Sequence, residues 1–183
     1  RGAEVIMLPM FKTVDEVLKC IEIIEGRCQI DLLFETPEAL ENISNFPLND
    51  IRFSHFGIND ISLALKYRNM FECFLTGILD EPTKYLTSKG KLFGIGGVGS
   101  YNAKPISPKI IMEMHKYYSS SRVILSRNFL NNLCFSSSKE SLLRNKSQII
   151  KLQNLIDKVM NEKDTNYEET KNKLNNILSY PNN

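Results

Sequence analysis

The sequence is organised by a regular alternation of short apolar runs with segments of helical periodicity. The runs that are long enough for strands lie at Val5–Leu8, Ile30–Phe34, Ile51–Phe56, Leu92–Ile95 and Arg122–Leu125. Strands that alternate with helices are typical of βα units, whose strands pair in parallel. The pattern therefore predicts an α/β fold with five parallel strands. The first run is wholly apolar, so we expect that strand to be covered on both faces.

The number of predicted strands leaves two architectures open. A complete (β/α)₈ barrel needs eight strands and typically about 250 residues, whereas this chain has 183 residues. It is either an open five-stranded sheet or the back part of a barrel, and periodicity alone does not choose between them. The chain starts with Arg1 rather than Met and a strand follows almost at once, so we expect that it begins inside a larger protein or was trimmed, and that no signal peptide precedes the strand.

Helix-start signals agree with the βα pattern. Thr13 and Glu16 have the spacing of a capping box, in which a hydroxyl and a carboxylate satisfy the first backbone N–H groups. Thr36-Pro37 and Ser107-Pro108 each place an N-cap residue before a proline at the first helical position. The first of these proline helices is expected to end near Phe46.

The last quarter of the chain differs from the rest, because strand signals stop and Lys, Asn and Glu become frequent. It predicts a long helix from about Lys139 to Asn161 and a shorter one from about Tyr167 to Leu178. We therefore divide the chain into a partial barrel, residues 1–135, and a C-terminal helical extension, residues 136–183. An apolar stripe on the long helix is expected to dock on the barrel or on a neighbouring subunit: Leu142, Ile149, Leu152, Ile156 and Val159.

Composition argues against several classes of protein. Hydrophobic residues make up 42% and charged residues 24% of the chain, the usual balance of a soluble domain. The net charge of +2 is too small to favour nucleic acid as a partner, and no apolar run approaches the ~20 residues that span a bilayer. The four cysteines form no C-x-x-C pair, which excludes a zinc ribbon and favours a reducing, cytoplasmic compartment.

Two carboxylates are the most suggestive polar residues. Glu35 and Asp60 end adjacent predicted strands, so they would lie about 5 Å apart across the sheet if those strands pair. Two carboxylates so placed repel each other unless a cation lies between them. Oxygen ligands without a nearby His or Cys favour Mg²⁺ or Mn²⁺ over zinc. The alternative interpretation is structural, with Asp60 as a helix cap and Glu35 paired with an arginine.

A glycine-rich segment follows the fourth predicted strand. Gly94 to Gly99 matches G-x-G-x-x-G, but Pro105 and Pro108 delay the next helix, which argues against a dinucleotide site. The glycines either let a backbone approach a small carboxylate or phosphate closely, or simply form a tight turn. His55 lies within the third strand, beside an apolar residue, and a structural role is favoured.

The order and spacing of these motifs resemble the aldolase/citrate lyase family of the phosphoenolpyruvate/pyruvate-binding barrels. The segments that resemble successive strand ends of that family are I-M-L-P at 6–9, L-F-E-T at 33–36, F-G-I-N-D-I at 56–61, F-G-I-G-G at 93–97 and I-L-S-R-N-F at 124–129. The resemblance covers about residues 2–130. It implies a partial TIM (β/α)₈ barrel that contains the last five parallel strands with their helices.

The resemblance also implies an activity, that of a carbon–carbon lyase of the aldolase or citrate lyase type. Glu35 and Asp60 would bind Mg²⁺ or Mn²⁺, and the metal would act as a Lewis acid on the enolate of a pyruvate- or oxaloacetate-like keto acid. Asn59 and Asp60, together with Gly96 and Gly97, would bind the substrate.

The chain departs from the family pattern, because the family's enolate-neutralising arginine and its acid/base residues come from earlier strands. No catalytic residue is therefore assigned within this chain. Two alternatives stay open: another enzyme of the phosphoenolpyruvate/pyruvate superfamily, and a non-catalytic flavodoxin-like binding module. The expected partners are a small keto acid and further copies of the chain in a homo-oligomer, with neither nucleic acid nor a membrane.

Overall fold

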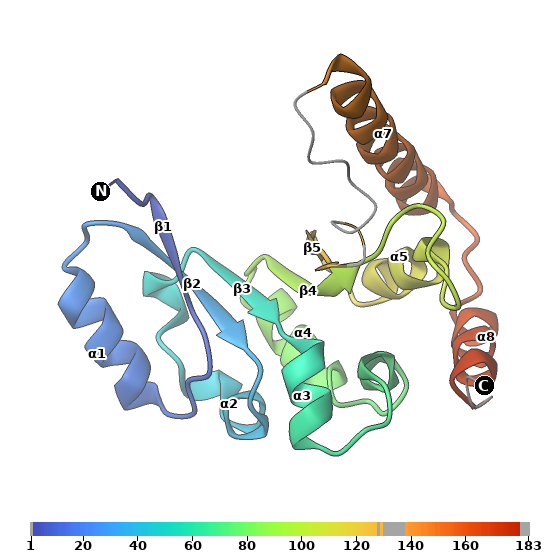
Figure 1. Cartoon of the computed structure of the whole chain (residues 1–183). Helices are drawn as coiled ribbons and strands as arrows, with labels where there is room; N and C mark the ends of the chain where they lie inside the picture. Colours follow the sequence, from blue (N-terminus) through green and yellow to red (C-terminus); the bar gives the residue numbers. More distant parts are fainter. Residues whose placement is uncertain (1, 128, 130–137, 180–183) are drawn as a thin grey trace. The chain divides into compact units, whose positions relative to one another are not determined.

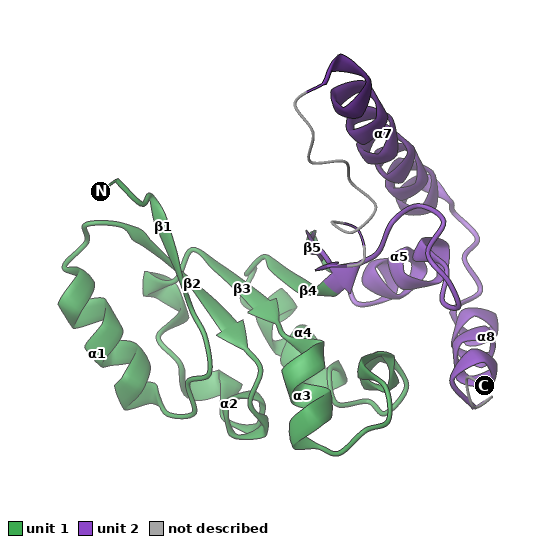
Figure 2. Cartoon of the chain, viewed as in Figure 1, with its two compact units in different colours: residues 1–96, 119–122 green, residues 97–118, 123–183 purple. Residues whose placement is uncertain are grey.

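The computed structural model describes residues 2–127, 129 and 138–179. Two compact units divide the chain (Figure 2): the first unit takes residues 1–96 and 119–122, and the second unit takes residues 97–118 and 123–183. The domain boundary that the sequence predicts, after residue 135, falls outside the described residues.

Five strands form one sheet, in which they lie in sequential order (Figure 1). They are β1 (Val5–Leu8), β2 (Gln29–Phe34), β3 (Phe53–Phe56), β4 (Phe93–Val98) and β5 (Arg122–Leu125). The pairs β1–β2, β2–β3 and β3–β4 run parallel. Successive strands are neighbours in a (β/α)₈ barrel, whereas flavodoxin-like sheets have the order 2-1-3-4-5. The α/β class and the partial-barrel architecture are confirmed, and the flavodoxin-like arrangement is excluded.

Helices begin where the start signals predict them. The Thr13 hydroxyl accepts a hydrogen bond from the Glu16 N–H at 3.4 Å, and the Glu16 carboxylate accepts one from the Thr13 N–H at 2.8 Å, which completes the capping box. Thr36 and Ser107 cap the two proline helices. The helices are α1 (Val14–Ile24), α2 (Pro37–Glu41), α3 (Ile58–Ala64), α4 (Asp80–Ser88), α5 (Pro108–Tyr117), α7 (Lys139–Asn161) and α8 (Tyr167–Ser179), with 3₁₀ helices η1 (Ile43–Asn45), η2 (Leu48–Asp50) and η3 (Met70–Phe74).

Some predicted boundaries are wrong. The helix after Thr36 ends at Glu41 rather than Phe46, and η1 and η2 carry the chain to β3. The fourth strand continues through its glycines to Val98, because the Ser126 N–H still bonds the Val98 carbonyl at 2.9 Å. Apolar periodicity locates the face that is buried, whereas the backbone hydrogen bonds set where an element ends.

Phenylalanines form an aromatic cluster within the core of the first unit. Phe11, Phe34 and Phe46 pack edge to face, with ring centroids 5.1 to 5.5 Å apart. Phe56 continues the cluster, at 5.9 Å from Phe34 and 5.6 Å from Phe93. Phe34 and Phe56 are also partners in the register of β2 and β3, so one aromatic contact aligns the carboxyl ends of these two strands.

The strand β1 is less buried than its sequence predicts. Ile6 is 40% exposed and Met7 is 39% exposed. The expectation that this strand is covered on both faces is therefore wrong. Among the described strands β1 pairs with β2 alone, so its other edge has no neighbour.

Helices α5, α7 and α8 make up most of the second unit. The Thr170 hydroxyl of α8 donates to the Glu113 carboxylate of α5 at 2.7 Å. Lys116 of α5 donates to the carbonyl of Val159 at 3.0 Å and also to that of Glu162, and so satisfies the C-terminal end of α7. The expected helical character of the region after residue 136 is confirmed for residues 139–161 and 167–179.

The apolar stripe of α7 is buried along part of its length only. Leu152 and Val159 are 3% and 0% exposed, whereas Leu142 and Ile149 are 61% and 50% exposed. Within this chain the stripe therefore docks only through its C-terminal half, and docking of the N-terminal half on a neighbouring subunit stays a prediction. Helical periodicity identifies a face of the helix but not how far the neighbouring elements extend along it.

This difference within one helix gives a matched pair of substitutions. Leu152→Ala removes buried methyl groups and should lower the free energy of unfolding by about 2–5 kcal/mol. Leu142→Ala removes the same atoms from an exposed position and should change it by no more than about 0.5 kcal/mol. Urea denaturation followed by circular dichroism measures both; equal losses would contradict the assignment of the buried face.

Two glycines of β4 make room for neighbouring side chains in the first unit. A methyl group on Gly94 would collide with the His55 ring, and one on Gly96 would lie 2.6 Å from Ile58. The His55 Nε2 lies 3.0 Å from the Gly96 carbonyl. His55 is 2% exposed, which is consistent with the predicted structural role. The next helix, α5, begins only at Pro108, in agreement with the argument against a dinucleotide site.

Burial lowers the pKa of His55 below its usual value, although the hydrogen bond to Gly96 and the charge of Asp31 act in the opposite direction. The unfolded chain therefore takes up a proton at a higher pH than the folded chain does. Stability from neutral His55 is complete above the unfolded pKa of about 6.5 and is lost as the pH falls below it.

A pH series of urea denaturation tests this sign. Between pH 8 and pH 5 the wild-type protein should lose more free energy of unfolding than His55→Gln, because glutamine does not titrate. Contributions of the other titrating groups cancel when the free energies of unfolding of the two proteins are subtracted at each pH. A steeper loss in the variant would contradict the direction of the shift.

Candidate metal site

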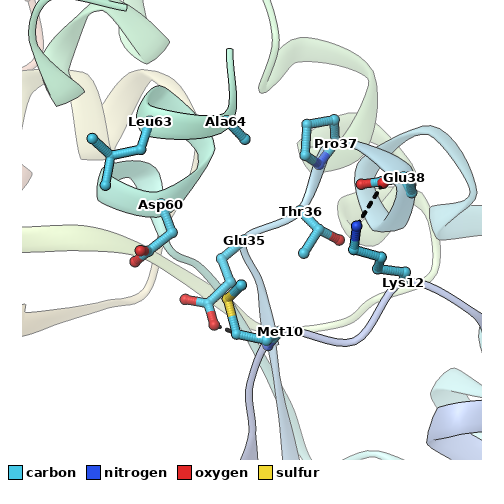
Figure 3. A pocket seen from close by; sticks show the side chains of 9 residues that line it. All are labelled: Met10, Lys12, Glu35, Thr36, Pro37, Glu38, Asp60, Leu63 and Ala64. Carbon is cyan, nitrogen blue, oxygen red and sulfur yellow. Dashed lines mark hydrogen bonds and ion pairs between the residues drawn. The ribbon is translucent and has the colours of Figure 1, made fainter. Parts of the chain in front are cut away.

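The two predicted ligands lie at the carboxyl ends of β2 and β3, and both belong to the first unit. Phe34 and Phe56 are register partners, so the residue opposite Glu35 is Gly57 rather than Asp60. Asp60 comes from the first turn of α3, one turn beyond the end of β3. Both side chains line the same pocket (Figure 3).

Glu35 is held by backbone groups. It is 6% exposed, and its Oε1 accepts a hydrogen bond from the Met10 N–H at 2.9 Å. A methyl group on Gly57 would lie 2.8 Å from both the Cβ and the Oε2 of Glu35, so the glycine makes this position possible. Burial raises the pKa of Glu35; the hydrogen bond from Met10 acts against this, and the charge of Asp60 adds to it.

Asp60 does not cap its helix. The N-cap of α3 is Gly57, without a side-chain hydrogen bond, and Asp60 lies three residues further on. Its own N–H donates to the Gly57 carbonyl at 3.1 Å. A carboxylate in the first helical turn is favoured by the helix dipole. Within residues 2–127, 129 and 138–179, no group donates a hydrogen bond to the Asp60 side chain, which leaves its oxygens available to a ligand.

The pocket has a volume of about 420 Å³. Its lining residues come from the ends of β1 and β2 and from α2 and α3: Met10, Lys12, Glu35, Thr36, Pro37, Glu38, Asp60, Leu63 and Ala64. The ammonium group of Lys12 is paired with Glu38 at 2.9 Å, and Figure 3 shows this pair apart from Glu35 and Asp60. Among the described residues that line the pocket, Lys12 is the one cation, and it has its own counter-ion.

Glu35 differs from the other buried carboxylates that the structure describes, because each of those has a cation beside it. Asp31 is bound by Arg52 through two contacts of 2.9 and 2.6 Å, and Glu113 lies 3.4 Å from Lys109. Glu35 has no such cation among the described residues, and its neighbour Asp60 is also negative. Buried charges are normally paired or bind metals, so the pair fits a bound cation.

The donor set indicates what kind of cation fits. Within the described part of the chain, no group of three or more His, Cys, Asp or Glu side chains lies close enough to form a metal cage. Mg²⁺ keeps several waters and needs only one or two carboxylates, whereas structural zinc needs four protein ligands. Glu35 and Asp60 are thus compatible with a hydrated hard cation.

The predicted substrate-binding residues are placed differently. Asn59 is exposed in the first turn of α3, and its carbonyl accepts a hydrogen bond from Ser62 at 2.6 Å. Gly96 belongs to the first unit and Gly97 to the second. Neither Asn59 nor Gly96 lines the pocket of Glu35 and Asp60. Their role in substrate binding stays a prediction.

Sequence reasoning missed three residues of the pocket. Met10 supplies a backbone donor to Glu35, a role that residue type does not reveal. The Lys12–Glu38 pair links residues 26 positions apart and depends on the tertiary fold. One signal was present: Lys12 follows the first strand end, as Glu35 follows the second.

No family model matches the sequence, and no curated protein sequence matches it. Among solved structures, the chain is similar to a citrate lyase from Burkholderia xenovorans LB400, with a TM-score of 0.53 and 16% sequence identity. The match covers 96% of this chain and 64% of the citrate lyase, so the chain spans less than two thirds of that protein. At this identity the likeness concerns the fold. No helix among the described residues has the length and apolar character that crossing a membrane requires.

Gly57 provides a test of the geometry around Glu35. Gly57→Ala should displace the Glu35 side chain, because the added methyl group would lie 2.8 Å from it. We expect Mn²⁺ binding, followed by electron paramagnetic resonance, to weaken at least about tenfold, the scale on which lost support of a ligand acts. Gly90→Ala is the control, since it introduces backbone strain at a φ of 63° where a methyl group meets nothing within 4 Å. Equal Mn²⁺ affinities in the two variants would contradict the role of Gly57.

Proposed function

We propose that this chain is part of a metal-dependent carbon–carbon lyase of the aldolase or citrate lyase type, with Glu35 and Asp60 as the ligands of Mg²⁺ or Mn²⁺. The observation that carries the proposal is a pair of carboxylates at the carboxyl edge of the sheet, Glu35 and Asp60, for which the described residues supply no cation. In (β/α)₈ enzymes this edge is where active sites lie. The fold likeness to a citrate lyase supports the same class.

The proposed substrate is a small keto acid of the pyruvate or oxaloacetate kind. A pocket of about 420 Å³ lies within the range of small-molecule sites. The negative charge of Glu35 and Asp60 would repel a free carboxylate, so such a substrate requires the cation for binding. When bound, the cation supplies Lewis-acid stabilisation of negative charge on a substrate oxygen.

This chain's own residues would bind the cation and orient the substrate. Glu35 is fixed through its Oε1, so the Oε2 faces its ligand in one orientation. Asp60 supplies the second oxygen donor from a short helix whose first turn is anchored by Gly57. Asn59, Gly96 and Gly97 remain the proposed substrate-binding residues. The arginine and the acid/base groups that the family resemblance implies would come from strands other than these five.

Conservative substitutions within the pocket test the metal pair. Glu35→Gln and Asp60→Asn each remove one ligand charge with little change in shape, and each should weaken Mn²⁺ binding at least about tenfold. In the complete protein, kcat for keto-acid release should fall strongly in both. The double variant should lower kcat little more than either single variant does, because both changes disable the same metal site.

Glu38→Gln is the matched control, because Glu38 lines the same pocket and has its own cation, Lys12. It should bind Mn²⁺ within about twofold of wild type, as expected for loss of a surface ion pair. Full activity of Glu35→Gln or Asp60→Asn in the presence of a chelator would overturn the proposed function. Equal losses in all three variants would show that the pocket's total charge, rather than a defined pair of ligands, attracts the metal.

A further inference from the structure

The backbone at Met10 adopts a conformation that its residue type disfavours. Its φ is 56°, in the left-handed region that side chains with a Cβ rarely occupy. Its side chain is 57% exposed, so packing of that side chain does not explain the conformation. The backbone groups of the turn that follows β1 do make specific contacts.

One of these contacts joins the turn to Glu35. The Met10 N–H donates to the Glu35 Oε1 at 2.9 Å, across 25 positions of the sequence (Figure 3). Hydrogen bonds to ionised carboxylates are stronger than those between neutral groups. In the left-handed conformation, the backbone N–H of Met10 therefore points at the Glu35 carboxylate.

The residues on either side hold the two segments together. The Thr36 hydroxyl donates to the Phe11 carbonyl at 2.8 Å. The Phe11 ring is 3% exposed and packs edge to face against Phe34, at 5.1 Å. The turn after β1 is thus anchored to the end of β2 at Phe11, one residue beyond the N–H that contacts Glu35.

We infer that Met10 is a positioning residue of the metal site, in which its left-handed backbone orients Glu35 for cation binding. Because Oε1 is engaged by the Met10 N–H, Oε2 is the oxygen left to the cation. This inference rests on the proposed function, since it assigns Glu35 as a ligand. It makes the backbone conformation at position 10, rather than the methionine side chain, the feature that matters.

Two substitutions at Met10 separate backbone from side chain. Valine is β-branched and disfavours a positive φ, whereas glycine adopts it freely. We expect Met10→Val to weaken Mn²⁺ binding about tenfold, the lower end of the range for lost outer-shell support. Met10→Gly should bind Mn²⁺ within about twofold of wild type, although it lacks the side chain. Electron paramagnetic resonance titration measures both in the full chain.

Lys66 offers a matched control for backbone strain. It has nearly the same conformation, with a φ of 58°, and lies in an exposed turn after α3. Lys66→Val should lower the melting temperature about as much as Met10→Val does while leaving Mn²⁺ affinity unchanged. Equal affinity losses in the two valine variants, or none in Met10→Val, would overturn the positioning role.

A second measurement does not depend on metal binding. The scalar coupling across the hydrogen bond, between the Met10 amide nitrogen and the Glu35 carboxyl carbon, should be detectable by NMR in the wild type and Met10→Gly and absent in Met10→Val. Wild-type protein that binds no Mn²⁺ but shows this coupling would overturn the proposed function and retain the contact. Absence of the coupling in the wild type would overturn the positioning role itself.

Discussion

The parallel register of β2 and β3 is the constraint on which the candidate site depends. Phe34 and Phe56 face each other in that register, and their rings pack 5.9 Å apart. A slip of one residue would turn every side chain of one strand to the other face of the sheet. Because the rings are buried, the slip is strongly disfavoured, and Glu35 is held directly opposite Gly57.

Other charged groups near the sheet that the structure describes have counter-ions. Asp31 near the amino end of β2 is bound by Arg52, and Lys12 in the pocket is bound by Glu38. Among the described residues, Glu35 is left with Asp60 and with the Met10 N–H, and no group donates a hydrogen bond to the Asp60 side chain. A fold that buries a carboxylate without a cation loses stability there, and such unfavourable arrangements concentrate where a ligand completes them. This imbalance links the fold to the proposed chemistry.

Much of the architecture could be predicted because βα units have local signals. The capping box at Thr13 and the N-cap residues Thr36 and Ser107, each followed by a proline, gave correct helix starts, since capping involves residues three positions apart. Exposure was predicted less well. Leu142 and Ile6 are apolar yet exposed, because the extent of a neighbouring surface depends on elements far away in the sequence.

The sequence by itself determined that the chain is an α/β protein with five strands, and that Glu35 and Asp60 follow two of them. Apolar periodicity and the position of polar residues after strands are local properties of the chain, so they can be seen without a structure. Only the tertiary structure decided that the strands lie in sequential order, that Asp60 comes from a helical turn rather than from the strand end, and that Met10 contacts Glu35. The strand order and the contact between Met10 and Glu35 join residues far apart in the sequence, and such contacts arise only when the strands pair and the aromatic core closes.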